Sequence, residues 1–135
     1  MNKEVRLRIG FALPQIGAIA GPDAITRVAR RAEELGFDTL WVLDRLLYPV
    51  NPRAPYPVGD GTLPINGNLE YMASATPKER ADFTGSPDQI ATDFEATKKL
   101  GASELVCDVQ FSPGIETVDD ILRRMEEIRT MAKSS

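Results

Sequence analysis

Residues 22–43 read PDAITRVARRAEELGFDTLWVL, and this stretch decides the fold class. Its first part predicts a helix that begins at Pro22, a favoured first helical position, and ends before Gly36, a typical stop. Apolar residues recur in it every three or four positions, as in a helix that packs one stripe against a core. Phe37–Leu43 is almost entirely apolar, which is typical of a strand buried on both faces of a parallel sheet.

A second strand is predicted before this stretch, over Val5–Leu13. Its large apolar residues alternate with smaller or charged ones, so one face of the strand is predicted to pack against a core. Pro14 ends it, because proline cannot donate to a sheet ladder. A strand, a helix and a strand therefore follow one another in the first third of the chain.

A similar helix–strand unit lies 65 positions further along. The matched positions are a helix-opening proline, a stop glycine and a strand leucine: Pro22 with Pro87, Gly36 with Gly101, and Leu40 with Leu105. Ser86 and Gln89 form a capping-box pattern before this helix, and the strand is predicted over Glu104–Phe111. A last helix is predicted from Val118 to Ala132, capped by Thr117. Convergence explains the shared cap and glycine, since every helix-to-strand unit favours them.

This order of elements predicts an α/β fold with parallel strands. Right-handed crossovers place the helices on one face, as in a barrel, or on both faces, as in a doubly wound sheet, and both arrangements stay open at this point. The chain has 135 residues, whereas a closed (β/α)8 barrel needs roughly 200 or more. One copy therefore cannot form a whole barrel.

Between Pro49 and Pro64 there are five prolines and two glycines, which leave no room for a regular element. We expect a long loop that packs across a strand mouth or a neighbouring subunit, with Tyr48 or Tyr56 buried there. Leu69–Ala75 is ambiguous, with a short strand as one interpretation. The predicted organisation is a single domain over 1–135, made of a first βαβ unit at 1–48, a Pro-rich loop at 49–68 and a C-terminal βαβα portion at 69–135.

Composition excludes several classes of function. Lys and Arg total 16 and Asp and Glu total 20, so the net charge of −4 argues against a nucleic-acid binder. The chain has no histidine, which removes imidazole-dependent catalysis and histidine-ligated metals. Its single cysteine, Cys107, excludes an intrachain disulfide and a CxxC zinc site. Without a signal peptide pattern or a long apolar run, we expect a cytoplasmic chain that binds neither nucleic acid, membrane nor metal.

The candidate site residues stand at the carboxyl ends of the predicted strands, where parallel α/β folds bind their ligands. The first strand end offers Pro14 and Gln15, the second Asp44 and Arg45, and the third Asp108, Gln110 and Ser112. A carboxylate beside a guanidinium makes Asp44 and Arg45 the sharpest pair. The alternative is structural: Asp44 caps the next turn and Arg45 is solvated.

Three other residues are interpreted as structural. Trp41 and Phe37 alternate with Thr39 on one strand and are predicted to belong to the core. Cys107 lies in the middle of an apolar strand, which predicts an inert buried thiol. No dinucleotide fingerprint, P-loop or nucleophile elbow is present, so the remaining chemistry must come from carboxylates, Arg, Tyr, Gln or a bound organic cofactor.

Two separate parts of the chain carry a family resemblance. The first holds RIGFALPQ (8–15), ARRAEELGFDTLWVLDRLLYP (29–49) and the Pro-rich stretch 50–64, and the second holds TGSPDQI (84–90) and the strand after Gly101. In this order they resemble the luciferase-like monooxygenases, specifically the actinobacterial branch that uses a deazaflavin coenzyme. The resemblance implies a (β/α)8 barrel fold and an oxidoreductase or monooxygenase activity. It also implies a deazaflavin (coenzyme F-420) or FMN as cofactor, bound near Gln15, Asp44, Arg45 and Asp108.

The chain departs from that family in two ways. By this resemblance it looks like the first and last parts of the barrel joined near residues 66–84, with the middle strands missing. Because the last strand of a closed barrel neighbours the first, we expect the strand order last, first, second. The family often has Asp-His where this chain has Asp44-Arg45, and Arg45 can hold an anion but cannot act as a base near pH 7.

Two functional interpretations follow. In one, the chain is a flavin- or deazaflavin-dependent oxidoreductase homologue that retains cofactor binding. In the other, it is a non-catalytic remnant that binds a ligand or itself. A partial barrel has two open strand edges and an exposed inner face, so we expect an obligate homodimer or a higher even-numbered oligomer. With a fourth strand at Leu69–Ala75, two chains would supply eight strands, the number of a barrel filled by side chains.

Overall fold

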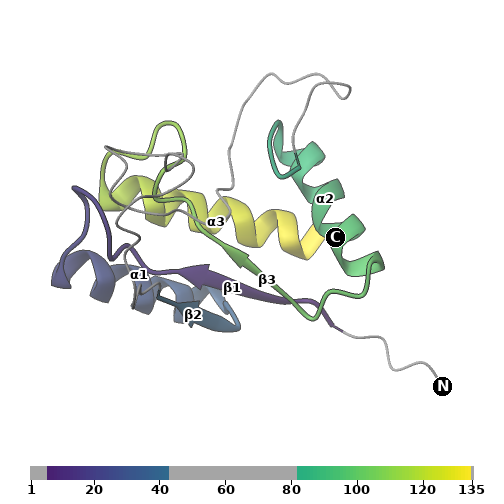
Figure 1. Ribbon diagram of the computed structural model, residues 1–135, viewed down its shortest axis with the longest axis horizontal. Helices are drawn as coiled ribbons and strands as arrows, with labels where there is room; N and C mark the ends of the chain where they lie inside the picture. Colours follow the sequence, from purple (N-terminus) through teal and green to yellow (C-terminus); the bar gives the residue numbers. More distant parts are fainter. Residues whose placement is uncertain (1–5, 43–81, 135) are drawn as a thin grey trace, which may run out of the picture.

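The computed structural model describes residues 6–42 and 82–134 (Figure 1). These residues form three helices and a small parallel sheet, which confirms the predicted α/β class. The elements in chain order are β1 (Arg8–Ala12), α1 (Pro22–Leu35), β2 (Thr39–Trp41), α2 (Pro87–Lys99), β3 (Glu104–Cys107) and α3 (Val118–Ser134).

The sheet has the strand order β2-β1-β3, with the first strand of the chain in the middle. Gly10 is paired in register with Thr39 on one side and with Val106 on the other, and both pairings are parallel. For the described strands this is the expected order, in which the first strand lies between the last strand and the second. Since a doubly wound sheet can share this order, the placement of the helices has to separate the two arrangements.

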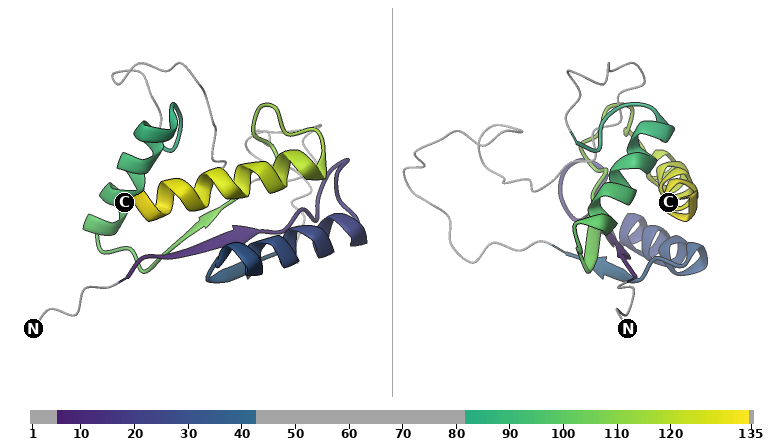
Figure 2. Two further views of the ribbon diagram at one scale, coloured as in Figure 1. Left: turned by 180° about the vertical axis from the view of Figure 1, so that it is seen from behind. Right: turned by 90° about the vertical axis from the view of Figure 1, so that its right-hand side faces the viewer.

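All three helices cover the same face of this sheet (Figure 2). Ile9 and Phe11, two residues apart on β1, both turn toward the helices and join one continuous core with them. Within the helical layer, α3 packs against α1 on one side and α2 on the other. The core residues from the helices and β3 are Val28, Ala32, Ile90, Phe94, Cys107, Val109, Ile121, Met125, Ile128 and Met131. In the described residues the helices therefore cover one face of the sheet and not both.

Local signals define the helix ends, as predicted. Gly36 follows α1 in the left-handed conformation, with φ of 76°, which most side chains avoid. The capping box before α2 is formed, because Ser86 Oγ accepts from the backbone N–H of Gln89 while the Gln89 side chain accepts from that of Ser86. Thr117 and Asp120 make the equivalent reciprocal bonds before α3.

The strands are shorter than predicted, and one interpretation was wrong. β2 was expected to be buried on both faces, but Leu40 is 46% exposed and Trp41 is 44% exposed. The reason is topological: β2 pairs only with β1 among the described strands, and the helical layer does not extend past it. Trp41 is therefore not a core residue. Phe37 does pack against the core, with its ring 5.2 Å from that of Phe11.

Several predictions fall on residues outside the described ranges. They concern the pair Asp44 and Arg45, the Pro-rich loop with Tyr48 and Tyr56, and the short strand at Leu69–Ala75. In the described part of the chain, no helix is long and apolar enough to cross a membrane.

Candidate ligand-binding site

Polar side chains just after β3 form the hydrogen bonds that end this strand. After Cys107, the carboxylate oxygen Oδ1 of Asp108 accepts a hydrogen bond from the backbone N–H of Gln110 at 3.0 Å. Ser112 N–H donates to the Val109 carbonyl at 3.0 Å, which completes the turn. A side chain that captures a backbone N–H two residues on competes with the sheet ladder, so β3 ends earlier than its apolar pattern predicts.

Gln110 connects this end of β3 to the end of β1. Its amide nitrogen Nε2 donates to the Leu13 carbonyl at 3.2 Å and also lies 3.3 Å from Asp108 Oδ1. Gln15 donates its backbone N–H to the same Leu13 carbonyl at 2.9 Å. The Gln110 amide therefore connects Asp108 to the Leu13 carbonyl that Gln15 also contacts.

These bonds fix the orientation of the Gln110 amide. Both partners of its nitrogen are oxygens that can only accept from an N–H, so a flipped amide would face oxygen to oxygen. The other amide atom, Oε1, is buried and has no hydrogen-bond partner. The second carboxylate oxygen of Asp108, Oδ2, is also buried without a partner.

Two unpartnered acceptors in one buried place are costly. Asp108 is 4% exposed and Gln110 is 9% exposed, so neither side chain is well hydrated. Burial raises the pKa of the Asp108 carboxyl, opposed by the hydrogen bonds from Gln110. Unpaired buried polar atoms are rare in folded proteins and mark strain or a site that a ligand completes. The arrangement can accept hydrogen bonds from N–H or O–H groups.

A shallow cavity of about 200 Å³ adjoins Gln110. Its wall is mostly apolar, and it joins the β1–α1 loop to the loop after β3. The other lining residues are Ile16, Gly17, Ala18, Ile19, Phe111, Ile115 and Glu116. An apolar recess beside a few buried polar groups is the usual composition of a small-molecule site.

A second polar cluster lies on the sheet face opposite the helices. The Thr39 hydroxyl donates to the Glu104 carboxylate, and the Trp41 indole N–H lies 3.1 Å from the Thr39 oxygen. Arg8 pairs with Glu104 at 3.3 Å. The hydrogen bond from Thr39 is the main cause that lowers the pKa of Glu104. Sequence reasoning missed this cluster, because it depends on the register that aligns three strands.

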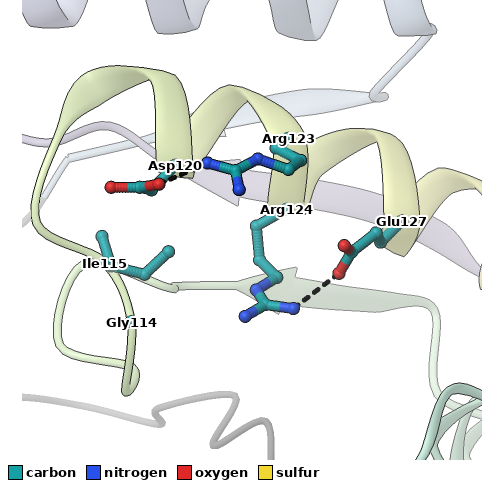
Figure 3. Close-up of a pocket in the computed structure, with 6 residues that line it drawn as sticks. All are labelled: Gly114, Ile115, Asp120, Arg123, Arg124 and Glu127. Atoms are coloured by element: carbon teal, nitrogen blue, oxygen red, sulfur yellow. Dashed lines mark hydrogen bonds and ion pairs between the residues drawn. The ribbon is translucent and has the colours of Figure 1, made fainter.

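Another pocket, between the loop after β3 and α3, is too small for an organic ligand (Figure 3). It measures about 50 Å³ and is lined by Gly114, Ile115 and four charged residues of α3. The cations are engaged within the helix, Arg123 with Asp120 and Arg124 with Glu127. Because both cations already have carboxylate partners on α3, we interpret this pocket as an ordinary part of the α3 surface and not as a ligand site.

Cys107 is fully buried in the core, as predicted. Burial is the main cause that raises the pKa of its thiol to about 12, so the nucleophilic thiolate is scarce at neutral pH. Among the described residues, no group of three or more His, Cys, Asp or Glu side chains could hold a metal ion.

Comparisons of the sequence with family models and with curated proteins, and of the structure with solved structures, give no match.

Proposed function

We propose that this chain binds a small organic ligand at the carboxyl ends of β1 and β3, and that Asp108 and Gln110 accept hydrogen bonds from it. The observation that carries the proposal is the pair of buried acceptors without partners, Asp108 Oδ2 and Gln110 Oε1. A ligand with N–H or O–H donors would satisfy both and remove the cost of leaving them unpaired. The position agrees with the general rule for ligands of parallel α/β folds.

The family resemblance suggests a flavin or deazaflavin as this ligand. Both molecules carry a ring N–H and a chain of hydroxyl groups, and these donors match the two free acceptors. The phosphate of either cofactor fits less well at the carboxyl ends of β1 and β3, because the Asp108 carboxylate there is negatively charged like the phosphate. The described residues would therefore hold the ring or the hydroxyl chain.

Such a cofactor, when bound, supplies hydride-transfer chemistry. Asp108 and Gln110 would orient it by accepting its hydrogen bonds, and the apolar wall of the neighbouring cavity would exclude water from one side. Binding is the function that these residues support best. The oxidoreductase activity implied by the resemblance is a further step, and it is tested separately.

The test is a calorimetric titration of the purified protein with riboflavin, FMN and the oxidised deazaflavin. We expect riboflavin to bind at least as well as FMN, because the described contacts address donor groups and not the phosphate. Asp108→Asn should weaken binding roughly tenfold or more, since it puts an N–H where the ligand's donor should meet an oxygen. Wild-type protein that binds none of the three ligands would contradict the proposal.

Glu34→Gln is the matched control. The change of a carboxylate to an amide is then made on an exposed side chain in the last turn of α1, at the opposite end of the strands, and should leave the affinity unchanged. For the oxidoreductase step, the bound cofactor is supplied in its reduced form and its absorbance is followed with candidate electron acceptors. Oxidation no faster than that of the free cofactor would limit the function to binding.

A further inference from the structure

The two flanks of the sheet carry complementary features, and both features lie near the amino-terminal ends of the strands. Beside β2, the helical layer ends in a groove of about 330 Å³ along α1, whose apolar lining residues are Ala29, Ala32, Phe37 and Leu40. On the opposite flank, Leu100 follows α2 and is 87% exposed. Each feature lies directly before or at the start of its strand, the groove at β2 and Leu100 before β3.

The outer edges of the two flanking strands also match. Trp41 turns its carbonyl toward β1, where it accepts from Leu13 N–H at 2.8 Å, so the backbone groups of its neighbour Leu40 point away from β1. On β3, Ser103 accepts from Arg8 N–H at 3.0 Å, so the backbone groups of Glu104 point outward. In the described residues no strand pairs with either edge.

The charges at the helix ends are complementary too. The last turn of α1 carries Glu33 and Glu34, which oppose the helix dipole, and it has no basic residue. The last turn of α2 carries Lys98 and Lys99, and both are exposed. The charged residues that line the groove beside β2 are Arg30, Glu33 and Asp38, so a lysine-bearing helix end that approaches the groove meets two carboxylates and one guanidinium.

We propose that a second copy of this chain docks its α2 and β3 flank on the α1 and β2 flank of the first. Leu100 of the partner enters the groove, and the partner's β3 continues the sheet beside β2 in parallel. A two-fold axis along the strands makes both junctions at once, so four strand edges are satisfied in one closed dimer. An antiparallel β2–β2 dimer would leave both β3 edges unpaired, which is why the head-to-tail arrangement is favoured.

The test measures mass by light scattering on a size-exclusion column and by sedimentation equilibrium over a range of micromolar concentrations. Wild type should have twice the chain mass of 14.8 kDa. Leu100→Asp and Leu40→Asp should each raise the dissociation constant at least about tenfold, because each places a charge in an apolar contact. Both side chains are exposed in a single chain, so folding, checked by circular dichroism, should be preserved.

Mixing the two variants gives the sharpest result. A mixed dimer has one junction with both changes and one junction with neither. Because a junction that one aspartate has already opened loses little more from a second, an equimolar mixture should dimerise more tightly than either variant alone. Ala18→Asp, an exposed change in the β1–α1 loop at the opposite end of the strands, is the control and should leave the mass unchanged.

Three results would overturn the proposal. The first is a wild-type monomer throughout the concentration range. The second is a dimer that Leu40→Asp dissociates and Leu100→Asp does not, which would indicate β2–β2 pairing. The third is an oligomer larger than two, which would show that the head-to-tail junction does not close on a two-fold axis.

Discussion

On the helix side of the sheet, Phe11 and its neighbours are held by close packing in one apolar core. On the opposite side, Arg8, Thr39, Trp41 and Glu104 are held by hydrogen bonds and an ion pair around Gly10. The same three strands supply both sets of side chains. The comparison teaches that close apolar packing stabilises one face of the sheet, while the other face of the single chain is held by polar contacts.

The largest expected effect is on the helix side. Phe11→Ala removes a fully buried ring and should lower the free energy of unfolding by about 3–5 kcal/mol. Val106→Ala, on the opposite face and only half-buried, should cost clearly less. Urea denaturation followed by circular dichroism measures both values. Equal losses would show that the two faces contribute alike.

Gly10 tests how tightly the opposite face is assembled. A Cβ atom there would stand 2.5 Å from the Thr39 hydroxyl oxygen and 3.1 Å from the nearest Trp41 carbon. Gly10→Ala should therefore destabilise the fold by about 1–3 kcal/mol, as overpacking does. Thr39→Ala removes the nearest clashing atom, so the double variant should lose less than the sum of the two single variants in urea denaturation. Simple additivity would contradict this steric explanation.

Asp108 predicts a dependence on pH. Burial raises the pKa of this carboxyl in the folded state, so the folded protein binds the proton more tightly than the unfolded chain does. Stability from this group therefore falls as the pH rises above the unfolded pKa of about 3.9. The Asp108→Asn variant has no carboxyl to ionise at this position, so it should gain stability relative to wild type as the pH is raised from about 3 to about 6. Urea midpoints measured at each pH decide this, and a constant difference would contradict it.

Glu104 should give the smallest effect and the opposite sign. The Thr39 hydrogen bond lowers the pKa of Glu104, so its stabilising contribution is present at neutral pH and is lost as the pH falls through that lowered value. Trp41 is the single tryptophan of the chain and reports on this cluster. Its fluorescence emission should shift in wild type as the pH falls through the pKa of Glu104. The Glu104→Gln variant should show no shift over the same fall in pH.

The helices could be predicted from the sequence because their signals are local. Pro22, Gly36, the Ser86 capping box and Thr117 each act within a few residues of the helix end they define. The strand order could also be predicted, although only through the family resemblance. Local pattern fails for β2, since an apolar run does not reveal whether a second strand or helix lies beside it.

The candidate site was predictable in part. Position at a strand end indicated Gln15, Asp108 and Gln110. In the structure Gln15 N–H and the Gln110 amide both donate to the Leu13 carbonyl, and the same amide donates to Asp108. Their chemistry was not predictable, because the free oxygens of Asp108 and Gln110 depend on how one amide is oriented in three dimensions. Asp44 and Arg45 stay predictions.

The central position of β1 has a consequence for how the chain folds. Arg8 and Glu104 are register partners although 96 residues separate them along the chain. A contact of this range must close a long loop before it gains any stability, so formation of the sheet should be slow compared with formation of the helices. During synthesis, β1 leaves the ribosome long before β3 exists. For that interval its backbone groups on the β3 side have no native partner, and a nascent chain in this state is open to pairing with the wrong strand.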